Sequence, residues 1–221
     1  MKFRKKIILC TLLCIFCTFC ACSSSDSKPV SQEETFLMVI EDIFTITGRG
    51  TVVTGRVDKG VVRVGDVVEI VGLTNEKRET TVDDIEAFRA VIEQAEAGDQ
   101  VGILLKDVAR DDVHQGQVLA TPGSIDAHTR FTADISILKA EEGSLSSSIR
   151  NGENLQFYFH TIDIEGHVSF LEEAEELTAG ESAQVEVVLT NLIAMEEGLE
   201  FSIRKEGKTL ATGTVREILA E

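Results

Sequence analysis

Short apolar or alternating runs separated by turn residues make up most of this chain. Residues 51–57 alternate between apolar and polar positions, and Asp58-Lys59-Gly60 then gives the signal of a hairpin turn. Residues 61–64 are predicted to pair back as the next strand. Further strands are predicted at 36–40, 67–71, 79–85, 101–105, 117–120, 130–138, 155–162, 167–171, 183–190, 199–204 and 209–218. Residues 87–97 are compatible with either a helical turn or a strand.

The length and spacing of these runs predict an all-β protein. Strands this short and this regular are typical of closed antiparallel barrels, and closure removes the edge strands through which sheets aggregate. Pro122-Gly123 is the best internal boundary. We therefore predict two packed antiparallel β-barrels, one over 36–123 and one over 124–221, each of a usual domain size.

The first 22 residues differ from this pattern. Four basic residues, Lys2, Arg4, Lys5 and Lys6, precede 15 uncharged residues at 7–21. A membrane-spanning helix needs about 20 apolar residues, so this stretch is short for a span and has the length of a signal-peptide core. We expect a signal helix that directs export.

The end of this segment reads Phe19-Cys20-Ala21-Cys22. It resembles the lipobox of bacterial lipoproteins, in which a small residue precedes the cysteine that is acylated. Segment 1–22 is therefore predicted to be a lipoprotein signal peptide with Cys22 as the lipidation site, and an uncleaved single-span anchor is the alternative. Residues 23–35 are rich in serine and polar residues and predict a flexible, disordered tether to the first barrel.

Cysteine usage limits the chemistry of the exported chain. All five cysteines lie in the first 22 residues, and lipid would consume the thiol of Cys22. The sequence thus predicts no disulfide framework, no thiolate metal site and no cysteine nucleophile.

The charge balance argues against nucleic acid as a partner. The formal net charge is −17, and without the four basic residues of the leader 17 basic residues remain against 38 acidic ones, a charge of −21. Phosphate contacts need lysine and arginine. The acidic surface is expected to keep the domain soluble. The more specific alternative is that it binds a cationic partner or divalent cations.

One long run carries a family resemblance. Residues 36–56, FLMVIEDIFTITGRGTVVTGR, resemble the opening of domain 2 of bacterial elongation factor Tu. The resemblance continues at 65–72 (GDVVEIVG), 97–105 (AGDQVGILL) and 116–120 (GQVLA), and for domain 3 at 156–159 (QFYF), 193–199 (IAMEEGL) and 201–204 (FSIR). It implies a translation-protein β-barrel followed by the C-terminal barrel of that family, over all of 36–221.

The nucleotide-binding motif of that family does not occur in these 221 residues. No G-x-x-x-x-G-K-[ST] run is present, and the sole Gly-Lys, Gly207-Lys208, has Ser202 where the first glycine would stand. Without that loop nothing cradles phosphates or positions Mg²⁺. We expect no GTP binding or hydrolysis by this chain alone, no cofactor and no enzymatic activity.

The resemblance also implies a ligand-binding site, because domain 2 of the family holds the aminoacyl end of charged tRNA. The matching positions are Glu41, Asp42, Phe44, Ile46, Gly48, Arg49, Thr54 and Gln100. Two acidic side chains beside a phenylalanine can meet an amine and an apolar group, and glycine permits close approach to the backbone. The alternative is that Gly48-Arg49-Gly50-Thr51 only shapes a barrel corner.

The second barrel departs from the family more strongly. The loop at 143–149 reads GSLSSSI, Asn154 stands where the family has an arginine that faces tRNA, and Glu153 and Glu200 add negative charge. These changes indicate a scaffold reused for another task.

No residue set predicts a metal site. The four histidines, His114, His128, His160 and His167, lack ligand spacing, and the acidic runs lack the glycine-containing loop of a calcium site. His160 and His167 could approach each other only if their strands form a suitable hairpin; surface positions are the simpler interpretation.

Three functions remain open. The first is a non-enzymatic lipoprotein, anchored outside the cytoplasm through lipid on Cys22, whose double barrel binds an envelope protein, a peptide or a small ligand. The second is a translation role linked to aminoacyl-tRNA and GTP, implied by the resemblance alone. The third is a surface adhesin.

Overall fold

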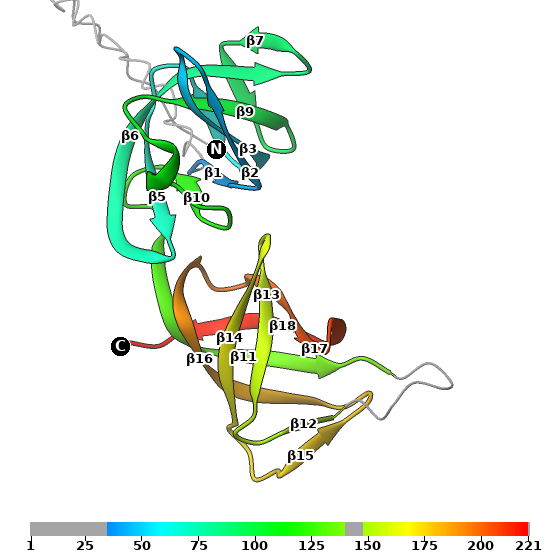
Figure 1. Ribbon diagram of the computed structural model, residues 1–221. Coiled ribbons are helices and arrows are strands. Elements are labelled where there is room, and N and C mark those ends of the chain that lie inside the picture. The colour runs from blue at the N-terminus through cyan, green and yellow to red at the C-terminus, as the bar shows by residue number, and fades with distance from the viewer. Residues whose placement is uncertain (1–34, 140–147, 221) are drawn as a thin grey trace, which may run out of the picture. The chain divides into compact units, whose positions relative to one another are not determined.

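The computed structural model describes residues 35–139 and 148–220 (Figure 1). The predicted signal, the lipidation site Cys22 and the tether up to Glu34 lie outside the described residues. Residues Glu33–Glu221 form one compact unit. The described part of this unit is all-β, with two closed six-stranded antiparallel barrels and one short 3₁₀ helix, η1 (Arg110–Asp112), as predicted for the fold class.

The first barrel takes its strands from the N-terminal half of the described chain. Its ring runs β1 (Leu37–Val39), β10 (Val118–Ala120), β5 (Val67–Gly72), β6 (Thr74–Ala87), β9 (Gln100–Leu105) and β3 (Gly50–Lys59), and pairing of β1 with β3 closes it. β2 (Asp42–Ile46) and β7 (Ala90–Ile92) extend the sheet at β3 and β6, and β4 (Val61–Arg63) pairs with β8 (Gln94–Glu96).

Strict alternation in the sequence explains this barrel. Along β3 the odd-numbered residues Thr51, Val53 and Val57 are buried, and the even-numbered ones are partly or fully exposed. Because successive side chains of a strand point to opposite faces, such a run has one face in the core and one in solvent. Val53, Ile85 and Ile103 lie together in the core, and none of them is accessible to solvent.

The second barrel follows Pro122-Gly123. Its ring runs β11 (Asp126–Ile137), β16 (Ser182–Met195), β14 (Ile162–Phe170), β13 (Asn154–Phe159), β17 (Glu200–Lys205) and β18 (Lys208–Ile218), which pairs with β11 again. β12 (Ser148–Arg150) and β15 (Glu176–Thr178) form a separate two-stranded sheet.

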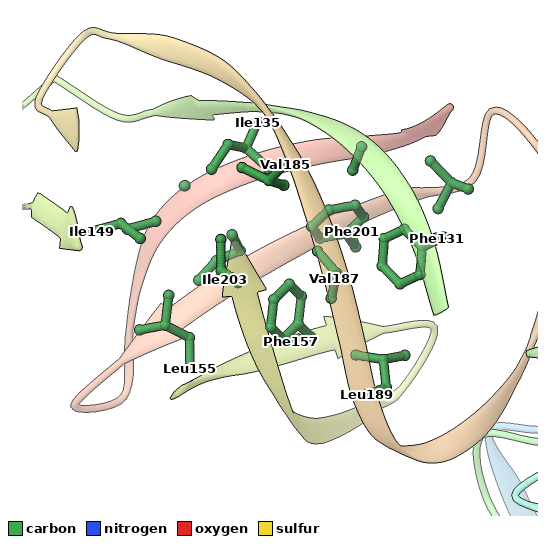
Figure 2. Packing of buried hydrophobic residues seen from close by; sticks show 14 of the residues in the cluster. Phe131, Ile135, Ile149, Leu155, Phe157, Val185, Val187, Leu189, Phe201 and Ile203 are labelled. Atoms are coloured by element: carbon green, nitrogen blue, oxygen red, sulfur yellow. The ribbon is translucent and has the colours of Figure 1, made fainter. Parts of the chain in front are cut away.

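Phenylalanines fill the second barrel. Figure 2 shows Phe131, Phe157 and Phe201 converging inside it, and the ring centroids of Phe131 and Phe157 lie 5.8 and 5.7 Å from that of Phe201. Gly213 on β18 makes room for them, since a Cβ there would lie 2.4 Å from Cζ of Phe201. A larger residue at this position would force the aromatic cluster apart.

The two barrels contact each other through a small apolar cluster and polar links. Buried residues of the first barrel, among them Val71 and Val118, pack with Ala194 of β16. The backbone N–H of Leu73 donates to the carbonyl of Leu192 at 2.8 Å. Lys59 and Glu196 form an ion pair with 2.6 Å between Nζ and Oε2.

Most predicted strands are present, with three corrections. Residues 61–64 do not pair back on the preceding strand, because β4 pairs with β8. The predicted strand 155–162 is interrupted: β13 ends at Phe159, and the chain turns at His160, whose φ is +50°. The helical alternative for 87–97 is wrong, since β7 and β8 occupy this stretch. β2, β12 and β15 lie outside the predicted strands.

Candidate functional site

The predicted binding residues gather on the outer face of a five-stranded part of the first barrel. The strands lie in the order β2, β3, β9, β6, β7, and their registers set which residues lie side by side (Figure 1). The inward positions carry the barrel core, so the alternate residues form a face directed away from it. We call this surface the outer face.

An apolar row crosses the outer face. Phe44 of β2 pairs with Val52 of β3, Val52 pairs with Leu104 of β9, and Leu104 pairs with Asp84 of β6. Phe44 is 53% exposed, whereas Leu104 is only 7% exposed. The row therefore begins with an aromatic ring available to a ligand and ends at a carboxylate.

A second, more polar row lies beside the first. Asp42 pairs with Thr54, Thr54 with Gly102, Gly102 with Glu86, and Glu86 with Val91 of β7. A Cβ on Gly102 would lie 3.4 Å from Val52 and 3.6 Å from Thr54. An added Cβ would thus already touch both side chains, so Val52 and Thr54 close over this glycine, and carboxylates lie on either side of it in the row.

Arg49 connects the β2–β3 turn to β6. Its Nη1 donates to Oε1 of Glu86 at 2.9 Å, and its Nη2 forms a short hydrogen bond with Asp84. The hydrogen bond to Glu86 and the two negative charges raise the pKa of Arg49 above its ordinary value. The guanidinium is thus engaged within the protein, although its side chain is 43% exposed.

Glycines shape the turn that presents Arg49. Gly48 has a φ of +80° and Gly50 a φ of +129°, a region that residues with a Cβ rarely adopt. The predicted corner is therefore present, and it also directs Arg49 toward β6. Shaping the corner and placing a functional side chain are compatible roles for this sequence.

The carboxylates of Glu41 and Asp42 differ in their hydrogen-bond partners. Glu41 accepts a hydrogen bond of 2.8 Å from the Gln100 side chain. Within the described residues, the carboxylate of Asp42 has no hydrogen bond and no ion pair. Asp42 is exposed, so an incoming cation would meet it without displacing a protein group.

The structure thus brings the predicted residues together and adds others to them. Asp42, Phe44, Ile46 and Thr54 share the outer face, Glu41 and Gln100 join at its margin, and Gly48 and Arg49 form its turn. The binding role itself stays a prediction. Sequence reasoning missed Asp84, Glu86, Val91, Gly102 and Leu104, because only the sheet register places them beside β2 and β3. Asp84 lies in the strand predicted at 79–85, and Gly102 and Leu104 lie in the one predicted at 101–105, but neither prediction gave the register.

The two histidines considered as a pair lie apart. His160 is in the β13–β14 turn, with its Nε2 3.3 Å from the Ala194 carbonyl, whereas His167 lies at the opposite end of the hairpin, opposite Asn154. Nδ1 of His167 is 2.9 Å from Oδ1 of Asn154. The idea that they approach each other is wrong. Residues 35–139 and 148–220 contain no cluster of histidine and carboxylate side chains suited to a metal ion.

Most of the second-barrel positions that differ from the family lie within the described residues. Asn154 hydrogen-bonds His167, and Glu153 forms an ion pair with Lys205 at 2.6 Å. Glu200 is exposed on β17. Of the loop 143–149, residues 143–147 lie outside the described residues.

No helix in the described part of the chain is long and apolar enough to span a membrane.

Comparison with protein families agrees with this architecture. Residues 50–120 match the family model of elongation factor Tu domain 2, and residues 124–219 match that of the elongation factor Tu C-terminal domain. The two matches correspond to the first and second barrels, and neither is a match to the GTPase domain. The chain is therefore similar to elongation factor Tu over two successive domains, with residues 50–120 matching domain 2 and residues 124–219 the C-terminal domain.

Proposed function

We propose that this protein is a lipid-anchored binding module that acts outside the cytoplasm, and that its ligand docks on the outer face of the first barrel. The proposal assigns no reaction to the chain. The two barrels serve as a rigid platform, and the tether at 23–35 gives the platform reach from the membrane. A flexible chain of this length spans roughly 20 Å on average.

One observation carries the binding part of the proposal. The half-exposed aromatic ring of Phe44 and the carboxylate of Asp42, which has no partner among the described residues, lie on the same strand and the same face of the sheet. The opposite face of this sheet packs into the barrel core. An exposed apolar group rimmed by polar ones marks interaction sites in soluble proteins. Phe88, Val91, Val67 and Val64 of the same barrel are also exposed, and of these Val91 lies on the outer face beside Glu86.

The export part of the proposal is supported by the sequence of the leader. A basic start, an apolar stretch of signal-peptide length and Ala21-Cys22 at its end favour cleavage and acylation at Cys22. The acidic charge of the remaining chain opposes binding to RNA, which also favours a role outside the cytoplasm.

Fractionation of cells that express the full chain tests the export claim. We expect wild type in the membrane fraction, with the mass increase of a lipidated cysteine, and sensitive to protease added to intact spheroplasts. Cys22→Ala should lack the lipid and remain as the unprocessed precursor. The matched control is Cys20→Ala, which should be lipidated like wild type.

Wild type found in the cytosol without lipid would overturn the proposal. The question would then turn to translation, the alternative that the family relationship suggests. Binding of charged tRNA at physiological salt would be the next measurement in that case.

A further inference from the structure

Negative charge dominates the outer face. Asp42, Asp84 and Glu86 lie on its two rows, with Glu41 at the margin, while Arg49 is the cation directed across it. Arg56 follows on β3, close enough to Asp58 to lower the pKa of that carboxyl, although burial outweighs it and raises the pKa overall. The potential at the centre of this face therefore attracts cations.

The pairing of Arg49 with Asp84 and Glu86 is easily reversed. The side chains of Arg49 and Glu86 are 43% and 45% accessible, and that of Asp84 is 21% accessible. Exposed ion pairs contribute only about 0.2–1 kcal/mol, so a ligand cation could replace Arg49 at small cost. Once Arg49 moves away, both carboxylates are open to a new donor.

An apolar group has a place beside that position. The exposed ring of Phe44 lies three strands from Asp84, at the other end of the apolar row. Nearer to the acidic pair, Val91 of β7 pairs with Glu86 and is 66% exposed, so it is the apolar neighbour of this carboxylate. A cation and an apolar side chain a few ångströms apart fit this arrangement.

We propose that the ligand of the outer face is a peptide segment of a partner protein with lysine or arginine next to an apolar side chain. Its cation takes the place of Arg49 between Asp84 and Glu86, the neighbouring apolar group packs on Val91, and the segment continues across the sheet to Phe44. Arg49 then acts as an internal competitor that occupies the acidic pair in the free protein. This inference rests on the proposed function, since it names the chemistry of the partner.

The sign of one mutational effect tests the inference. Fluorescence anisotropy would measure binding of a labelled short peptide of alternating lysine and leucine to the full chain in detergent micelles, and of a counterpart with glutamate in place of lysine. We expect the cationic peptide to bind and Arg49→Ala to tighten its binding about twofold to fivefold, because the competitor is lost. Glu86→Gln should weaken binding about twofold to fivefold, and Phe44→Ala about tenfold.

The second barrel supplies matched controls for general attraction to an acidic protein. Arg204 and Asp163 form an exposed ion pair of the same kind, with 3.3 Å between Nη1 and Oδ1. Arg204→Ala and Asp163→Asn make the same changes in net charge as Arg49→Ala and Glu86→Gln. Because salt screens distant charges, these control variants should leave binding within twofold of wild type. Equal effects in both barrels would overturn the inference.

Other outcomes separate this inference from the proposed function. Suppose that Arg49→Ala binds the cationic peptide more weakly than wild type does, and that wild type prefers the glutamate peptide. These results would show that Arg49 contacts an anionic ligand, and they would refute the chemistry proposed here. Because the measurement uses purified protein, that result leaves the export claim intact. Failure of lipidation at Cys22 would refute the proposed function whatever the peptide does.

Discussion

Single residues shape the turns of the second barrel. His160 is the clearest case, because it replaces a strand residue with a left-handed turn, φ +50°, and sets its ring against the carbonyl of Ala194. Burial lowers the pKa of His160 below its ordinary value, and this outweighs the opposite effects of the Ala194 carbonyl and the charge of Asp58. The folded protein therefore favours the neutral imidazole.

A pH dependence of stability follows from this residue. Below the ordinary histidine pKa of about 6.5, the unfolded chain takes up the proton more readily than the folded chain, so the free energy of unfolding falls as the pH drops. The loss should continue until the lowered pKa of His160 is passed. Asp58 acts in the opposite direction at the lower pH where carboxyls titrate, because its pKa is raised, chiefly by burial.

Urea unfolding of His160→Asn measures this contribution. Asparagine tolerates the positive φ and does not titrate, and its side chain is too short to reach the Ala194 carbonyl. Between about pH 7.5 and about pH 5.5 the variant should lose less stability than wild type. His114→Asn, at an exposed position of the first barrel, is the control. If His160→Asn and wild type lose the same amount, the burial of this imidazole does not govern the acid response.

At the scale of elements, the β6–β7 hairpin stands out for strain. Ala87 and Ala90 pair across a two-residue turn in which Phe88 has a φ of +51° and Arg89 a φ of +67°. Turns of this kind favour Asn-Gly, because a left-handed conformation costs other residues about 1–2 kcal/mol each. Phe88 is also 93% exposed, so packing does not repay this cost.

Replacing the turn by Asn-Gly should therefore stabilise the protein. We expect Phe88→Asn with Arg89→Gly to raise the free energy of unfolding by about 1–2 kcal/mol, measured by chemical denaturation. Phe88→Ala with Arg89→Ala is the matched variant, since it removes the same side chains but keeps residues that disfavour a positive φ. Equal stability of the two double variants would contradict the strain.

Elements also mark the limit of what the sequence predicts. Alternation predicts β3 and the part of β16 that contains Val185, Val187 and Leu189, because every second residue there is buried. It fails for β4, which pairs with β8 across 30 residues of chain rather than with its neighbour, because pairing depends on barrel closure. The charged half of the site was missed for the same reason. Asp84 and Glu86 lie 35 and 37 residues from Arg49, and only the register of β6 brings them to it.

For the whole molecule, the fold class follows from pattern and family resemblance together, and the function does not. Two barrels packed through Val71, Val118 and Ala194 form a platform without a nucleotide-binding motif in the chain. The leader that suggests an anchored platform lies outside the described residues. The proposed function requires two things of the same protein. It must be exported and anchored through Cys22, and it must bind its partner on the outer face of the first barrel.

Photo-crosslinking in living cells tests that claim most directly. A photoreactive amino acid in place of Phe44 would sample the outer face, and the same residue in place of Val188, which is 42% exposed on the second barrel, would serve as control. The account predicts a discrete protein adduct at position 44, absent at position 188, that protease added to intact spheroplasts removes. An adduct with tRNA or ribosomal components, protected from that protease, would contradict it.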